Sequence, residues 1–181
     1  MYQVDGLDTV VELTDCPRPD IGAPLPVVLA DDYSLVLAYL VSEPDPNWDG
    51  SYATLVSPES EGLLVALVRF QRPYAHMFGP PNDEAFHGHP LAQRGLAAYS
   101  VSEIRHSSWL RQLERMNSVH DRHDRAQFMA FRRHLVWAFH DSTFECIAEG
   151  FDVELQRGSL RAVMPRMLEL LREPPGSVEP R

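Results

Sequence analysis

Short apolar runs separated by turn-forming residues fill the N-terminal part of this chain, a pattern typical of β-strands. It predicts strands at Val10–Leu13, Val27–Ala30, Tyr33–Val41, Tyr52–Ser57 and Leu63–Phe70. Asp31 and Asp32 indicate a tight turn between the second and third strands, and residues 58–62 indicate a longer turn between the last two. We therefore expect two consecutive hairpins.

The apolar pattern is interrupted after residue 70. Residues 71–95 are irregular, because the Gly-Pro-Pro at 79–81 prevents regular strand pairing. Pro90 is expected to open a short helical turn that ends at Gly95. Residues 99–106 alternate again and predict one more strand.

Three helices are expected in the second half of the chain. Ser107 or Ser108 caps the first, which runs to about Asn117. Asp124 and Gln127 have capping-box spacing and start the second. The third is the amphipathic stretch 160–171, in which Pro165 either makes a kink or marks the first turn. The apolar side chains expected along the first two helices are Leu110, Leu113, Met116, Phe128 and Phe131.

A long hairpin is predicted from His134–His140 and Thr143–Leu155, with Asp141 and Ser142 as a two-residue turn. In this register His134 faces Glu149, and His140 is diagonal to Glu145. One face is apolar and belongs to the core: Leu135, Trp137, Phe139, Phe144, Cys146 and Ala148. The other face carries His134, His140, Thr143, Glu145 and Glu149, mixed with Val136, Ala138 and Ile147.

These elements predict an α+β fold with a mainly antiparallel sheet built from hairpins. Two short helices are inserted after the middle loop, and one amphipathic helix closes the chain. We expect a single globular domain over residues 1–172, with residues 173–181 as a disordered tail.

Charge and histidine content single out the middle of the chain. The net charge is −10 over 181 residues, and residues 1–75 alone carry −9. All eight histidines lie between His76 and His140, where the net charge is +2. An acidic protein of this kind is not expected to bind nucleic acid. The middle segment supplies the side chains that titrate near neutral pH.

Other features of the composition bear on the cellular location and on the chemistry that is available. No apolar stretch approaches the ~20 residues of a membrane span, and the N-terminus does not look like a signal peptide. The two cysteines form no motif, and the chain has no lysine, which removes Schiff-base chemistry. We expect a cytoplasmic protein that does not associate with membranes.

The polar hairpin face is the first candidate site. His140 and Glu145 could form a catalytic pair in a cleft, poised for proton transfer or metal binding. The alternative is the solvent face of an antiparallel sheet, on which such cross-strand pairs are common, and the pattern favours this alternative.

A second candidate is the His-x-His motif of His87 and His89, which could share a divalent transition metal with His140. The alternative is a loop in which His89 caps the turn at Pro90. His120 and His123 also have ligand spacing, although histidines at a helix C-terminus explain them better.

Three stretches resemble a small set of uncharacterised bacterial proteins: MFGPPNDEAFHGHPLAQRGL, SSWLRQLERMNSVH and FHDSTFECIAEGF. The resemblance covers less than half of the chain. It implies no fold, activity, cofactor or catalytic residue.

The sequence is compatible with two functions. The first is a small enzyme, either metal-assisted or using acid–base chemistry, with the His/Glu site above and Arg94 or Arg105 holding an anionic small molecule. The second is a non-catalytic accessory, regulatory or immunity-type protein, whose acidic N-terminal part would attract a basic protein partner. The sequence does not decide between them.

Overall fold

The computed structural model describes residues 2–44, 49, 51 and 55–173, and it shows an α+β fold with two antiparallel sheets. The strands are β1 (Thr9–Glu12), β2 (Val27–Ala30), β3 (Leu35–Leu40), β4 (Leu63–Gln71), β5 (Ala75–Gly79), β6 (Val101–Arg105), β7 (Arg133–Ala138), β8 (Thr143–Ala148) and β9 (Gly150–Gly158). The helices are α1 (Ser108–Asn117), α2 (Arg125–Phe131) and α3 (Leu160–Arg172), with short 3₁₀ turns η1 (Phe86–Gly88) and η2 (Ala92–Arg94).

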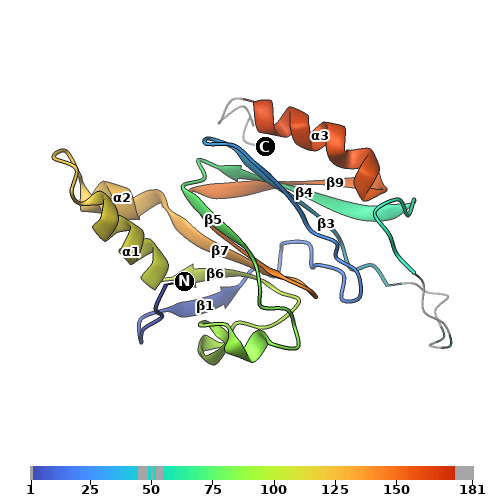
Figure 1. Ribbon diagram of the computed structural model, residues 1–181, viewed down its shortest axis with the longest axis horizontal. Helices are drawn as coiled ribbons and strands as arrows, with labels where there is room; N and C mark the ends of the chain where they lie inside the picture. Colours follow the sequence, from blue (N-terminus) through green and yellow to red (C-terminus); the bar gives the residue numbers. More distant parts are fainter. Residues whose placement is uncertain (1, 45–48, 50, 52–54, 174–181) are drawn as a thin grey trace.

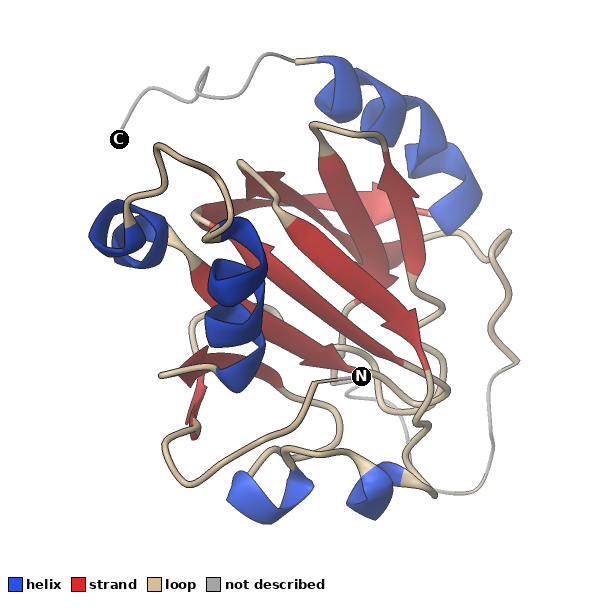
Figure 2. Ribbon diagram, turned by 60° about the vertical axis from the view of Figure 1, so that its left-hand side comes forward, coloured by secondary structure: helices blue, strands red, loops and turns tan. Residues whose placement is uncertain are grey.

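The elements stack in four layers (Figures 1 and 2). A four-stranded sheet, in the order β2-β3-β4-β9, packs on a five-stranded sheet, in the order β1-β6-β7-β8-β5. Helix α3 covers the outer face of the four-stranded sheet through Leu160, Val163 and Met167. Helices α1 and α2, the 3₁₀ turns and Tyr2 cover the outer face of the other sheet. Both faces of both sheets are therefore largely buried.

The core between the sheets contains the apolar hairpin face that the sequence predicts. Leu135, Trp137, Phe139, Phe144, Cys146 and Ala148 are all fully buried there. Burial raises the pKa of the Cys146 thiol, which keeps it protonated. The rings of Phe70 and Phe144 lie 5.4 Å apart and join the two sheets.

The register of this hairpin differs from the prediction by two residues. Trp137 pairs with Phe144 and His134 pairs with Ile147, because the turn contains four residues and is closed by a hydrogen bond from Phe139 N to Ser142 O. An even shift leaves every side chain on its predicted face. The pairing of His134 with Glu149 is nevertheless wrong.

The predicted strand Thr143–Leu155 is in fact two strands in different sheets. β8 ends at Ala148, and after Glu149 the chain continues as β9, which pairs with β4. The β4–β5 connection changes sheets at the same place, since Glu149 N donates to Gln71 O and Arg72 forms an ion pair with Glu149. Two chain crossings thus lie side by side.

The hairpin predicted from Tyr52–Ser57 and Leu63–Phe70 is described only in part. Residues 52–54 lie outside the described residues, and Leu55–Ser57 is not a strand. β4 pairs instead with β3 and β9. The irregular segment 71–95 contains the unexpected edge strand β5, which pairs with β8 up to Gly79.

The helices begin where the sequence predicts, but their buried faces differ in part. Ser107, Asp124 and Ser159 each cap a helix by accepting a backbone N–H three residues on. Met116 and Phe131, however, are exposed. Trp109 and Glu114 face inward from α1 instead.

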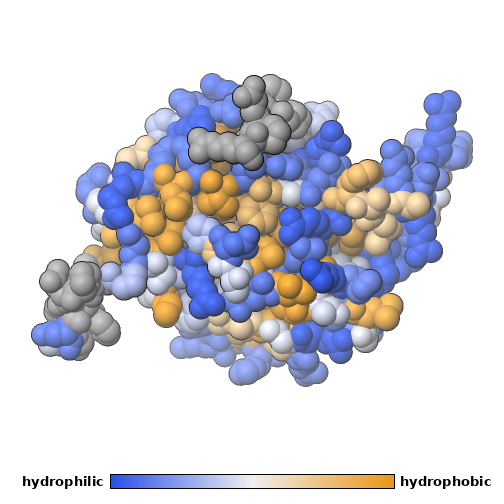
Figure 3. Space-filling model, turned by 180° about the vertical axis from the view of Figure 1, so that it is seen from behind, coloured by the Kyte–Doolittle hydropathy of each residue, from blue (hydrophilic) through white to orange (hydrophobic). Residues whose placement is uncertain are grey.

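Among the residues that the structure describes, no helix is both long and apolar enough to cross a membrane. On the face drawn in Figure 3, apolar side chains form separate groups among polar ones.

Candidate functional site

The carboxylate of Glu145 lies at the centre of a buried polar cluster. The Tyr2 hydroxyl donates to Oε2 at 2.5 Å, and Nε2 of His134 lies 2.9 Å from the same oxygen. Nε2 of His89 lies 3.3 Å from Oε1. Three donors therefore converge on one carboxylate, which is the arrangement that makes a buried negative charge tolerable.

Four separate parts of the chain build this cluster. Glu145 is on β8, and His134 is on β7, diagonal to it and on the same face of the sheet. Tyr2 comes from the N-terminal segment, where its ring stacks on Trp109 with centroids 5.6 Å apart. His89 ends η1. The face that the sequence favours as solvent-exposed is therefore covered, and His134 is 0% exposed.

Backbone and hydroxyl groups fix both imidazole rings. Leu91 N donates to Nδ1 of His89 at 3.1 Å, so the ring proton of neutral His89 is on Nε2, which faces Glu145. Nδ1 of His134 bonds the Ser107 hydroxyl at 2.8 Å, which again leaves Nε2 to donate to Glu145. Each ring therefore has both nitrogens engaged.

These contacts control the ionisation of the cluster. Burial alone would raise the pKa of Glu145, but the hydrogen bonds from His134, His89 and Tyr2 outweigh it and lower the pKa to about 2. Burial and the adjacent carboxylate raise the pKa of Tyr2. At neutral pH Glu145 is thus an ionised acceptor, and Tyr2 keeps its proton.

A cavity of about 200 Å³ opens beside the cluster. Its lining residues are Met77, Phe78, Gly79, Pro80, His89, Thr143 and Glu145. The Thr143 hydroxyl is already engaged, since it donates to Pro81 O at 3.1 Å. The cavity therefore combines mainly apolar walls with one ionised carboxylate.

His140 does not join Glu145. Its Nδ1 lies 2.9 Å from Asp141 Oδ1, its Nε2 lies 3.9 Å from Asp83 Oδ2, and its side chain is 39% exposed. The hydrogen bond with Asp141 raises the pKa of His140. Both His140 and Glu145 contact the segment 82–94, but they do so at different residues, Asp83 and His89.

The two histidines of the His-x-His motif have different surroundings. His89 is buried on Glu145, whereas His87 is exposed. His87, His89 and His140 therefore do not form the predicted metal site. Within the described ranges, no group of three or more His, Cys, Asp or Glu side chains is arranged to hold a metal ion.

The two arginines expected to bind substrate have other surroundings. Arg94 donates to the carbonyl oxygens of Gly6 and Asp8, and so it fastens the N-terminal segment that carries Tyr2. Arg105 is exposed at the end of β6. Neither arginine lines the Glu145 cavity.

Tyr2 is the member of the cluster that sequence reasoning missed. It belongs to no periodic stretch, and only the tertiary structure brings it to Glu145. The alternation of the sequence places His134 on the polar hairpin face. It does not indicate that other elements bury that face.

Comparison of this chain with protein-family models, with curated proteins and with solved structures found no match.

Ser107→Ala tests whether the hydrogen bond between the Ser107 hydroxyl and His134 adds to the stability that Ser107 gives as the cap of α1. Ser107 both accepts Leu110 N–H and bonds His134, so we expect the free energy of unfolding to fall by ~2–3 kcal/mol. The matched control is Ser159→Ala, which removes a buried cap without such a partner and should cost ~1 kcal/mol. Equal losses in urea denaturation would mean that the bond to His134 contributes nothing.

Proposed function

We propose that this chain binds a small organic molecule in the Glu145 cavity. A donor group of the ligand, an ammonium or a hydroxyl, meets the carboxylate, and its apolar part packs against Phe78 and Pro80. The supporting observation is an ionised carboxylate in the lining of a mainly apolar cavity. Binding sites for small molecules commonly combine such walls with a few placed polar groups.

The two oxygens of Glu145 differ in their remaining capacity to accept hydrogen bonds. Oε2 already receives the Tyr2 hydroxyl and the His134 ring. In the described part of the chain, Oε1 has only the longer contact with His89. A carboxylate oxygen can accept two hydrogen bonds, so Oε1 is the atom to which a ligand donor would bind.

The proposal is one of binding, not of acid–base catalysis. A carboxyl group with so low a pKa is a weak base, and neither imidazole that faces it has a nitrogen left for a substrate. The sequence hypothesis of a His140–Glu145 catalytic pair gains no support from the geometry. The alternative function, an acidic accessory protein for a basic partner, stays a prediction from charge alone.

The test is titration with benzylammonium, with benzoate as a probe of similar size and opposite charge. We expect benzylammonium to bind with a dissociation constant of about 1 mM. In NMR spectra it should shift the amides of residues 77–79 and 143–145. Benzoate should leave these signals unchanged, because Glu145 repels it. Equal binding of the two probes, or shifts elsewhere, would contradict the proposal.

Two variants locate the binding. Glu145→Gln should abolish the preference for the cation, and Phe78→Ala should weaken binding by removing an apolar wall. Phe78 is 46% exposed, so its replacement leaves the buried cluster intact. His140→Gln is the control, since His140 lies outside this cavity. A loss of binding in the control would place the ligand elsewhere.

A further inference from the structure

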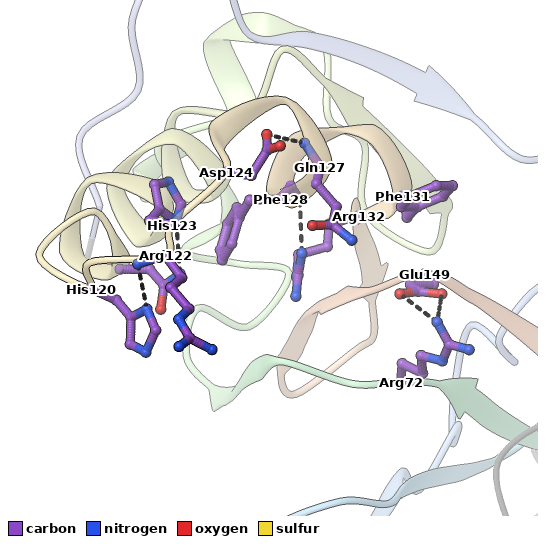
Figure 4. Close-up of a pocket in the computed structure, with 11 residues that line it drawn as sticks. Arg72, His120, Arg122, His123, Asp124, Gln127, Phe128, Phe131, Arg132 and Glu149 are labelled. Atoms are coloured by element: carbon purple, nitrogen blue, oxygen red, sulfur yellow. Dashed lines mark hydrogen bonds and ion pairs between the residues drawn. The ribbon is translucent and has the colours of Figure 1, made fainter.

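A second hollow, of about 290 Å³, lies where the α1–α2 connection and α2 meet the two chain crossings between the sheets. Figure 4 shows its side chains. Three of them are arginines, Arg72, Arg122 and Arg132, and the acids beside them are Asp124 and Glu149. The hollow therefore carries a formal net charge of +1 in a chain whose net charge is −10.

Arg132 is held in place before any ligand arrives. Its guanidinium carbon lies 4.1 Å from the ring centroid of Phe128 and 4.9 Å from that of Tyr74. Nη1 also donates to Phe128 O at 2.8 Å. A guanidinium fixed in this way has N–H groups left and loses little conformational entropy when it binds an oxyanion.

The α1–α2 connection supplies further donors. Arg122 N donates to Nδ1 of His120 at 3.1 Å, so the Nε2 of His120 carries a hydrogen. Arg122 itself is exposed. In Figure 4, His120 and Arg122 lie on one side of Arg132, and the Arg72–Glu149 pair lies on the other.

Both acids of the hollow already have partners. Asp124 is engaged as the cap of α2 through Gln127 N, and Glu149 pairs with Arg72 at 3.1 Å. Phe131 also lines the hollow and is 60% exposed, which is unusual for a large apolar side chain. Figure 4 shows Phe131 on the same side of Arg132 as the Arg72–Glu149 pair, so an exposed aromatic ring and arginines line the same hollow.

We infer that this hollow binds a small molecule that carries a phosphate group and a planar ring. Arginine donors match the oxygens of a phosphate, and Phe131 offers a face for the ring. The size of the hollow suits a small molecule better than a macromolecular surface. The site is separate from the Glu145 cavity, and the two share no lining residue.

The experiment compares phenyl phosphate, inorganic phosphate and phenol by calorimetry and by NMR. We expect phenyl phosphate to bind most tightly and to shift the amides of residues 117–132. Inorganic phosphate should bind more weakly, because it lacks the ring, and phenol should not bind. Added salt should weaken both phosphate complexes.

Matched variants distinguish binding in this hollow from a general attraction between arginines and anions. Arg122→Gln should weaken phenyl phosphate binding about tenfold, because it removes a charged donor. Arg125→Gln removes the same charge from the exposed start of α2, outside the hollow, and should leave binding unchanged. Phe131→Ser should weaken phenyl phosphate binding but not inorganic phosphate binding. Equal losses in Arg122→Gln and Arg125→Gln, or no binding of either phosphate, would overturn the inference.

Discussion

Phe144→Ala is expected to lower the free energy of unfolding by ~3–5 kcal/mol, because it opens a cavity between the two sheets. The ring of Phe144 is 0% exposed and lies 5.4 Å from Phe70 and 6.1 Å from Trp137. Sheet-on-sheet packing leaves little room for these neighbours to close the gap. Urea denaturation followed by tryptophan fluorescence measures the loss.

The control for this variant is Phe78→Ala. Phe78 also contacts Phe144, but it is 46% exposed at the edge strand β5. Its replacement should cost less than ~1 kcal/mol. Similar losses in the two variants would show that Phe144 is not at the centre of the core.

Glu145→Gln is expected to make stability less dependent on pH in acid. The pKa of Glu145 is lowered from 4.5 to about 2 in the folded protein, which corresponds to ~3 kcal/mol. Because the folded-state pKa is the lower one, this stabilisation is present above pH 4.5 and is lost as the pH falls toward 2. The wild type should therefore lose stability in this range, and the variant should lose less.

The measurement is urea denaturation of both proteins from about pH 6 to about pH 3. The difference in unfolding free energy between the wild type and Glu145→Gln should narrow by ~2 kcal/mol from pH 6 to pH 3. Glu43→Gln is the control, since Glu43 pairs with Arg157 at the surface and its contribution is screened by salt. A difference that stays constant with pH would mean that folding does not lower the pKa of Glu145, and one that grows toward acid would mean that the carboxyl is neutral in the folded protein.

The division of the hairpin into two faces was predictable, whereas its pairing was not. Alternation from Leu135 to Ala148 depends only on strand geometry, and the two-residue error in register preserves it. The turn length depends on the local hydrogen bond from Phe139 to Ser142, which alternation does not encode. The change of sheet at Glu149 is hidden because apolar positions continue through it.

The polar cluster could be predicted only in part. His134 and Glu145 share a face by periodicity, and that much follows from the sequence. Their burial does not, because it requires α1, η1 and Tyr2 to cover the sheet. Those contacts join positions far apart in the chain, and no local pattern reports them. The prediction from the His-x-His motif failed for the same reason, since His89 is buried against Glu145 and His87 is exposed.

The side-by-side crossings at Arg72 and Glu149 make the chain between them one long closed loop. This loop contains four strands of the five-stranded sheet. β4 cannot pair with β9 until the two ends of the loop meet. Closing such a loop costs entropy before the pairing contributes any stability. We therefore expect the last strand and α3 to join late in folding. Until then, the β4 edge that β9 later pairs with is open to other strands.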